Sequence, residues 1–201
     1  MRVQSLALFG YGGHAKEVAA QIGQDVTFFV DDKYVNGAAK PISEFDPEEY
    51  AMMVAVSDSK HRLKIVERLP KETVYFTFIH PTALILDDEI IIGEGSFIGA
   101  NSILTTNIQI GNHAILNRGN HIGHDCIIGN YFSAMPGSIV SGNVHIGNGV
   151  YLGTNSSVIE KKYILHDIVI GANSVVIRDI TERGTYVGVP AKKIEKQDVS
   201  A

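Results

Sequence analysis

A histidine–aspartate pair in the middle of the chain, His124-Asp125, has the residue types of a general base and a supporting carboxylate. Histidine has an ordinary pKa of about 6.5, so near neutral pH it can take a proton from an attacking amine or hydroxyl. No serine or cysteine of the sequence stands in a clear nucleophile setting, which favours direct group transfer over a covalent enzyme intermediate. We expect His121, His145 and His166 to be non-catalytic, although His121 could line a cleft between subunits.

A second group of residues has the chemistry of a phosphate site. The run Gly10-x-Gly12-x-x-Ala15 lies between an expected strand and an expected helix, and an acidic pair follows about twenty residues later. Glycines let the backbone approach a diphosphate, the helix N-terminus offers free N–H groups, and a carboxylate can accept a hydroxyl hydrogen bond. We predict a nucleotide site here; the alternative is a purely structural tight turn. The predicted substrate-binding residues are Gly10, Gly12, Gly13, His14, Asp31, Asp32 and Ser57.

The elements that position the histidine–aspartate pair follow from a repeat. An aliphatic residue, in one case alanine, recurs at every sixth position from Leu86 to Val176 without a break in phase. This period fits neither a helix nor a simple strand and is typical of a solenoid. Glycine often follows the aliphatic residue, as a corner requires. His124 is the third residue of its hexad, which predicts that it lies at a corner.

The residues that precede the aliphatic ones should point outward, because side chains alternate along a strand. Three hexads per coil would stack apolar outward residues on two walls, with Phe97, Ile115, Tyr151 and Val169 on one and Ile103, Ile139 and Val175 on the next. Exposed apolar patches of this kind mark association surfaces, so the pattern predicts a homo-oligomer. The alternative is that the chain's own N-terminal domain covers a wall.

The first 79 residues have a different pattern, which alternates strands and helices. Strands are expected at residues 6–9, 26–30, 52–56 and 74–78, and helices at residues 14–22 and 60–68. This alternation predicts a parallel sheet. The fold class is therefore an α/β Rossmann-like βαβ domain over residues 1–79, followed by a β-solenoid of hexapeptide repeats over residues 80–201. About 80 residues make only half of a full dinucleotide-binding fold, so NAD is not expected.

Composition excludes several classes of protein. The chain has 201 residues, 45% of them hydrophobic and 19% charged, which indicates a folded protein with little disorder. A net charge of −5 argues against nucleic acid or an anionic membrane as the main partner. No apolar run is long enough for a membrane span, and the first residues do not read as a signal peptide. The single cysteine, Cys126, is expected in the core and fits a reducing cytoplasm.

The sixteen hexads resemble the hexapeptide-repeat, left-handed parallel β-helix proteins. The spacing of the hexads does not determine the handedness of the coil, and crossovers between parallel strands are right-handed in about 98% of cases. The left-handed coil is therefore implied only by this resemblance. The fused βαβ front end resembles, more narrowly, the bacterial sugar O- and N-acetyltransferases, including sialic-acid O-acetyltransferases and PglD-type enzymes. The motifs that carry the resemblance are Gly10-Tyr11-Gly12-Gly13-His14, Asn117-x(4)-Ile122-x-His124-Asp125-Cys126, Pro136-Gly137-x(4)-Gly142-Asn143-Val144, and Val187-Gly188-Val189-Pro190-Ala191-Lys192.

The resemblance implies an acetyl-CoA-dependent acyltransferase that works as a homotrimer, with its active site between subunits and no metal. It implies that His124 is the general base, that Asp125 orients or supports the imidazole, and that Asn117 bonds to substrate or to His124. It places the pantetheine arm of the donor on Gly142, Thr154 and Ala172. Lys192 and Lys193 could meet the CoA phosphates or belong to a solvated tail.

One position departs from the family's pattern. PglD-type relatives commonly carry a second histidine where this chain has Ser133, which puts the identity of the acceptor in doubt. The favoured acceptor is a UDP-, dTDP- or GDP-linked 4-amino-deoxy sugar used in surface glycan synthesis, and the alternative is a sialic-acid-like hydroxyl. More distant alternatives are a γ-carbonic-anhydrase-like zinc enzyme built on His121, His124 and His145, and a non-catalytic nucleotide-sugar sensor.

Overall fold

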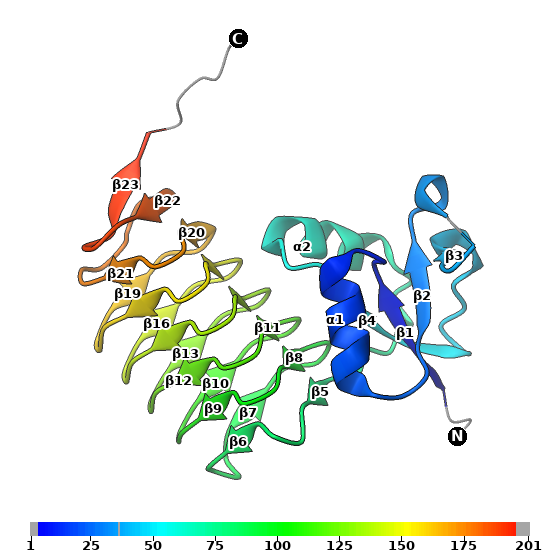
Figure 1. Cartoon of the computed structure of the whole chain (residues 1–201), viewed down its shortest axis with the longest axis horizontal. Coiled ribbons are helices and arrows are strands. Elements are labelled where there is room, and N and C mark those ends of the chain that lie inside the picture. Colours follow the sequence, from blue (N-terminus) through cyan, green and yellow to red (C-terminus); the bar gives the residue numbers. More distant parts are fainter. Residues whose placement is uncertain (1–3, 36, 196–201) are drawn as a thin grey trace.

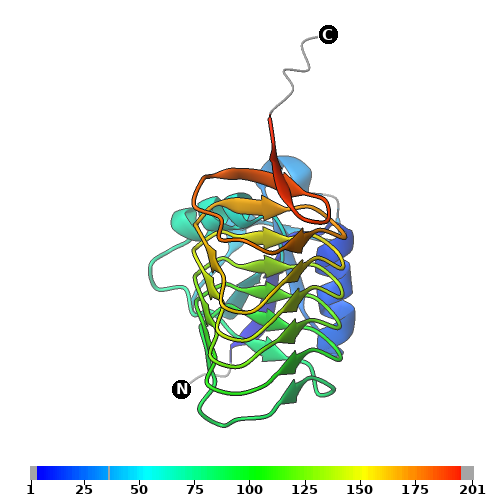
Figure 2. The same cartoon turned by 90° about the vertical axis from the view of Figure 1, so that its left-hand side faces the viewer.

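The chain consists of a small α/β domain beside a tall triangular coil. The computed structural model describes residues 4–35 and 37–195. In Figure 1 the α/β domain lies to the right of the coil, and the described end of the chain leaves the coil at its top. Figure 2 shows the successive turns of the coil stacked one above the other. No helix in these described residues is long and apolar enough to cross a membrane.

The N-terminal domain is a four-stranded parallel sheet in the order β3-β2-β1-β4. Its elements are β1 (Ser5–Phe9), α1 (Gly13–Ile22), β2 (Thr27–Val30), the 3₁₀ turns η1 (Asp32–Tyr34) and η2 (Ile42–Glu44), β3 (Lys40–Pro41), β4 (Tyr50–Val54) and α2 (Ser59–Arg68). The two helices and the strands β1, β2 and β4 match the predicted elements, with boundaries shifted by up to two residues. The short edge strand β3 was not predicted, because Pro41 cannot donate to a strand ladder and masks the pattern.

The coil is a parallel β-helix of three sheets. The eight-stranded sheet contains β5 (Phe78–Ile79), β8 (Phe97–Ile98), β11 (Ile115–Leu116), β14 (Ser133–Ala134), β17 (Tyr151–Leu152), β20 (Ile168–Ile170), β22 (Gly184–Val187) and β23 (Lys192–Ile194). The six-stranded sheet contains β6 (Leu84–Ile85), β9 (Ile103–Leu104), β12 (His121–Ile122), β15 (Ile139–Val140), β18 (Ser157–Val158) and β21 (Val175–Val176). The five-stranded sheet contains β7 (Ile91–Ile92), β10 (Gln109–Ile110), β13 (Ile127–Ile128), β16 (His145–Ile146) and β19 (Tyr163–Ile164).

Each coil from β7 upward uses eighteen residues, as three hexads require. Gln109 pairs with Ile91 below it and with Ile127 above it, and the aliphatic hexad residues from Ile98 to Val176 are buried. The prediction of an unbroken phase from Leu86 is wrong at its start. Ile85 pairs with Leu104, whereas Leu86 is 62% exposed, because the turn before Ile92 holds one extra residue.

The predicted strand at residues 74–78 does not form. Tyr75 makes only an isolated bridge to Met52, and Phe78–Ile79 (β5) instead pairs with Phe97–Ile98 in the first coil. The apolar residues of this segment pack partly against the N-terminal domain and partly against the coil. Because residues 74–78 pack against two hydrophobic cores, they have the apolar composition of a strand without forming one within a single sheet.

The apolar wall predicted to be an association surface is divided. Phe97 and Ile115 are buried in one cluster with Leu8, Val18 and Met53, so the N-terminal domain covers this part of the eight-stranded sheet. The prediction that these two residues face a partner is therefore wrong, and the alternative of self-coverage is confirmed for them. Higher on the same wall Val169 is exposed, and Ile139 is exposed on the six-stranded sheet.

A buried cation joins the two parts of the chain. The Arg62 side chain of α2 has no solvent exposure and donates to the carbonyls of His113, Tyr131 and Phe132 in the coil, and of Val56 and Ser57 in its own domain. Burial lowers its pKa to about 9, so the guanidinium remains charged at neutral pH. Ser133 completes the junction, because its Oγ accepts from Arg62 Nη2 at 2.8 Å and donates to the Ser57 carbonyl at 2.7 Å.

Two histidines near this guanidinium are held neutral. Burial, with a smaller contribution from the charge of Arg62, lowers the pKa of both His14 and His113 to about 4. The His113 ring stacks on Tyr131 and meets Tyr75 edge-on, so its surroundings are aromatic on two sides. His14 Nε2 and His113 Nδ1 are buried without a hydrogen-bond partner among the described residues.

Replacing Arg62 should loosen the junction. Arg62→Ala leaves several buried carbonyls without a donor, and each unsatisfied group costs roughly 1–3 kcal/mol. We expect a lower free energy of unfolding, measured by urea denaturation, and a smaller loss for the exposed control Arg178→Ala. Equal effects of the two substitutions would contradict the role assigned to Arg62.

The neutral histidines make stability sensitive to acid. Their folded pKa of about 4 lies below the ordinary 6.5, so the unfolded chain binds more protons between these values. The free energy of unfolding should therefore be highest above pH 6.5 and should fall as the pH drops towards 4. His113→Phe removes one of the two groups and should shrink the fall in melting temperature between pH 7.5 and 5 by about half. His145→Phe, at an exposed outward position, should leave that fall unchanged.

Candidate active site

His124 and Asp125 share one corner of the coil, between β12 in the six-stranded sheet and β13 in the five-stranded sheet. Adjacent side chains of a regular strand diverge, but Asp125 has a left-handed backbone with φ 58°. Its carboxylate therefore turns back on its neighbour, and Oδ2 lies 2.6 Å from His124 Nδ1. The bond from His124, together with one from Asn107, holds the pKa of Asp125 below its usual value. A proton on Nδ1 leaves Nε2 as the basic nitrogen.

The residue one coil above must be small for the imidazole to lie where it does. A Cβ on Gly142 would come within 2.5 Å of His124 Nε2 and 2.6 Å of Cε1. Asn143, which follows it, donates its backbone N–H to the His124 carbonyl at 2.7 Å, and its Nδ2 lies 3.5 Å from His124 Nδ1. Gly142 was predicted as a donor-binding residue, and the structure places it directly against the predicted base.

Other predicted residues lie on a different edge of the coil. Asn117 sits between β11 and β12, is buried, and accepts the backbone N–H of Arg118 on Oδ1 at 2.8 Å. Thr154 and Ala172 stack on that same edge, between the eight- and six-stranded sheets. Strand β12 separates Asn117 from His124, so one chain presents the predicted site as two halves. Lys192 is exposed at the start of β23.

The glycine run lines the predicted nucleotide site. A hollow of about 300 Å³ is bordered by Gly10, Gly12, Asp31, Tyr34 and His61, among others, at the carboxyl ends of β1 and β2. Gly10 has φ 119°, which other residues rarely adopt. A Cβ on Gly12 or Gly13 would meet nothing within 4 Å, so packing does not explain these two glycines. The sequence prediction that a ligand approaches the backbone at these two positions stays a prediction.

The two residues of the acidic pair, Asp31 and Asp32, make different contacts. Asp31 Oδ1 forms a 2.5 Å ion pair with Arg68 Nη2 at the hollow, whereas Asp32 lies outside the lining and accepts the backbone N–H of Ser43 at 3.2 Å. His14 is not among the residues that border the hollow, and burial together with the charge of Arg62 lowers its pKa to about 4. The binding roles of His14 and Asp32 remain predictions.

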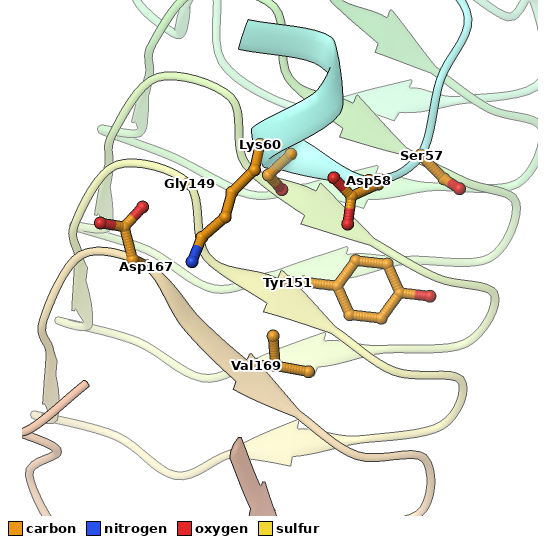
Figure 3. Close-up of a pocket in the computed structure, with 8 residues that line it drawn as sticks. Ser57, Asp58, Lys60, Gly149, Tyr151, Asp167 and Val169 are labelled. Atoms are coloured by element: carbon orange, nitrogen blue, oxygen red, sulfur yellow. The ribbon is translucent and has the colours of Figure 1, made fainter. Parts of the chain in front are cut away.

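Ser57 borders a second and larger hollow, of about 450 Å³, between the start of α2 and the coil. Figure 3 shows Ser57, Asp58 and Lys60 on one side of it and Tyr151, Asp167 and Val169 on the other. Asp58 caps α2 by accepting the His61 N–H at 2.7 Å. Ser133 lies one coil below Tyr151 and has no solvent exposure. The position at which PglD-type relatives commonly carry a second histidine therefore belongs to the domain junction in this chain.

Sequence reasoning missed Asn107 and Asn143, which flank the pair from the coils below and above. A signal existed: both stand eighteen residues from Asp125, and asparagine tolerates a left-handed corner. Cys126 was read correctly as a core residue, since it is fully buried and donates to the Ser141 carbonyl. Among the described residues, no three histidine, cysteine or acidic side chains are grouped to hold a metal ion.

Comparisons with known proteins find similarity in the N-terminal domain and over nearly the whole chain. Residues 5–69 match the family described as the PglD N-terminal domain. The acetyltransferase domain of PglB from Neisseria gonorrhoeae is 29% identical, with a TM-score of 0.84 over 96% of this chain and 100% of that one. WeeI from Acinetobacter baumannii is 28% identical, with a TM-score of 0.86 over 96% and 100%.

A third structure contains ligands. A mutant of perosamine N-acetyltransferase from Caulobacter crescentus, in complex with CoA and GDP-perosamine, is 26% identical, with a TM-score of 0.83 over 96% of this chain and 98% of that one. The full-length likeness confirms the predicted fold, a Rossmann-like domain followed by a left-handed parallel β-helix. The family resemblance and the acyltransferase class are confirmed with it.

Filling the space beside the base should remove activity without unfolding the chain. Gly142→Ala places a methyl group against the His124 imidazole, whose ring can rotate away but then leaves its position over the corner. We expect a loss in kcat of about tenfold or more, because misplacing a reacting group by about 1 Å is costly. The melting temperature should change by less than it does for Gly123→Ala, where the new Cβ would meet backbone atoms.

Proposed function

We propose that this chain, a PglD-like acyltransferase of the hexapeptide-repeat superfamily, transfers the acetyl group of acetyl-CoA to the amine of a nucleotide-linked 4-amino-deoxy sugar. The observation that carries the proposal is the His124–Asp125 pair, in which the Nδ1 hydrogen bond leaves Nε2 free at an exposed corner. The structural relatives support the coarser class, an acetyl-CoA-dependent sugar acetyltransferase.

In the proposed step the amine nitrogen attacks the thioester carbonyl carbon, and His124 Nε2 takes the proton that this nitrogen loses. The carbon–sulfur bond then breaks, and the CoA thiolate receives the proton from the imidazolium. Asp125 remains ionised and stabilises the imidazolium through Nδ1, which its lowered pKa favours. The acetyl group passes directly from CoA to the amine in this step, without a covalent acyl-enzyme intermediate.

The nucleotide is proposed to occupy the 300 Å³ hollow. Gly12 and Gly13 leave the start of α1 open to a phosphate, and the helix N-terminus favours negative charge. Asp31, held by Arg68, borders the same hollow and can accept a hydroxyl hydrogen bond. A GDP-sugar is the ligand of one relative, whose structure holds GDP-perosamine, and this supports the nucleotide-sugar class for the acceptor.

A homotrimer is proposed because one chain presents the site in two halves. His124 and Gly142 lie on one edge of the coil, whereas Asn117, Thr154 and Ala172 lie on another. A neighbouring copy that packs against the six-stranded sheet would bring its second edge to the first. The exposed Ile139 on that sheet gives such a contact apolar area.

Thiol release from acetyl-CoA tests the proposal directly. The assay compares wild type with His124→Ala across UDP-, dTDP- and GDP-linked 4-amino sugars and free sialic acid. We expect turnover with one nucleotide amino sugar and a loss of about 10²–10⁴-fold in the variant, as for a missing general base. His145→Ala, at an exposed outward position, is the matched control and should keep wild-type turnover.

The other outcomes separate the alternatives. Turnover with sialic acid alone would assign the O-acetyltransferase activity. Full turnover by His124→Ala would overturn the role of His124. Binding of a nucleotide sugar, measured by calorimetry, without any thiol release would favour a sensor.

A further inference from the structure

We propose that Asn107 is a positioning residue for the His124–Asp125 pair, and that the irregular first turn of the coil exists to hold it. The proposal rests on the proposed role of His124 as the base. Asn107 touches neither reacting atom; it acts through the carboxylate of Asp125.

Both carboxylate oxygens of Asp125 form hydrogen bonds, and this is the first observation behind the proposal. Oδ2 lies 2.6 Å from His124 Nδ1, and Oδ1 accepts from Asn107 Nδ2 at 2.6 Å. A carboxylate held at both oxygens cannot rotate about its own bond. A surface carboxylate held only by its neighbour would be free to turn to water, and the imidazole would lose the contact that fixes its tautomer.

The backbone does not by itself demand asparagine at position 107. Asn107 is left-handed with φ 52°, but the same kind of corner is formed by His113, Tyr131 and Lys161 in other coils. An amide at this position tolerates the conformation and also supplies a donor to the carboxylate one coil above. The side chain of Asn107 therefore makes a contact that the turn alone does not require.

Asn107 is itself anchored from below by Asp87. Oδ2 of Asp87 accepts from Thr106 Oγ1 at 2.5 Å and from the Asn107 backbone N–H at 3.0 Å, while Oδ1 accepts from the Glu89 backbone N–H at 3.0 Å. Asp87 stands in the turn with the extra residue, where the hexad phase breaks. These hydrogen bonds, first the one from Thr106, keep the pKa of Asp87 below its usual value.

The result is a column of polar side chains along one edge, from Asp87 through Asn107 and Asp125 to His124. Its charged and titratable members are the two carboxylates and the imidazole. The strands that flank the corner add His121 on β12 and, one coil above, His145 on β16, both exposed. Lys161 continues the edge two coils above Asp125.

Two variants separate positioning from packing. Asn107→Gly removes the amide donor while a glycine accepts the left-handed φ, and Asn107→Asp replaces the donor with a second negative charge. The matched control is Asn101→Gly, at an exposed left-handed corner of another edge. Melting temperatures of Asn107→Gly and Asn101→Gly should agree, which shows that the coil keeps its fold.

The first measurement needs no substrate. In ¹⁵N-histidine-labelled protein, with His124 assigned by its loss in His124→Ala, the wild-type imidazole should be the Nδ1–H tautomer when neutral. Asn107→Gly should weaken that preference. Asn107→Asp, which places a second carboxylate against Asp125 in place of the donor, should weaken it as well. An unchanged tautomer in both variants would overturn the proposal.

The second measurement is steady-state kinetics with the acceptor found active. Asn107→Gly should lower kcat about tenfold with KM for acetyl-CoA unchanged, as expected for a lost bond to a charged group. Asn107→Asp should lower kcat at least as much, because it also removes the amide donor. Equal losses in Asn101→Gly would mean a structural role. A failure of wild-type turnover would count against the proposed function only, because the tautomer of His124 decides the role of Asn107 separately.

Discussion

The spacing between stacked coils is the constraint on which the rest of this structure depends. Neighbouring strands of a sheet lie about 4.8 Å apart, so residues eighteen apart in this chain come to lie directly above one another. At a corner the left-handed backbone brings side chains of successive coils within hydrogen-bond distance, as Asn107 and Asp125 show. The same spacing would bring a Cβ at position 142 within 2.5 Å of His124 Nε2, so the ring keeps its present place only beside glycine. The geometry of the His124–Asp125 pair is thus set by the repeat.

The second constraint is the buried charge of Arg62. A guanidinium with no exposure requires its donors to be satisfied, and the carbonyls that satisfy them come from both parts of the chain. The loop that bears Val56 and Ser57 is thereby fixed against β14 of the coil. Since Val56 borders the hollow at the glycine run and Ser57 borders the hollow beside α2, one cation sets the position of both.

This junction also explains a departure from the family's pattern. Ser133 occupies the position at which PglD-type relatives commonly have a histidine, and here its small hydroxyl bonds Arg62 and Ser57 without any exposure. The donor and acceptor capacity of that position is used up inside the chain. The hollow above Ser133 is bordered by Lys60 and Tyr151 instead (Figure 3).

Several features could be predicted from the sequence because they depend on local pattern. The six-residue period requires three-sided coils, the glycine run after a buried strand requires an open helix start, and His124 in the third place of its hexad requires a corner. Other features depend on contacts between distant residues. The sequence gives no sign that Phe97 and Ile115 are covered from within, since an apolar outward wall looks the same under a domain or under a second copy. The separation of Asn117 from His124 also appears only when the corners are assigned to edges.

The sequence by itself determined the architecture and the place of the His124–Asp125 pair at a corner, because periodicity and residue type are local and need no knowledge of the packing. Only the tertiary structure decided which residues serve the site and which serve the junction. Ser133 looks like a site residue and bonds to Arg62, whereas Asn107 looks like an ordinary corner and holds Asp125. The physical reason is that a hydrogen bond depends on the direction of both partners, and this direction is fixed only once the coils are stacked and the domain is docked.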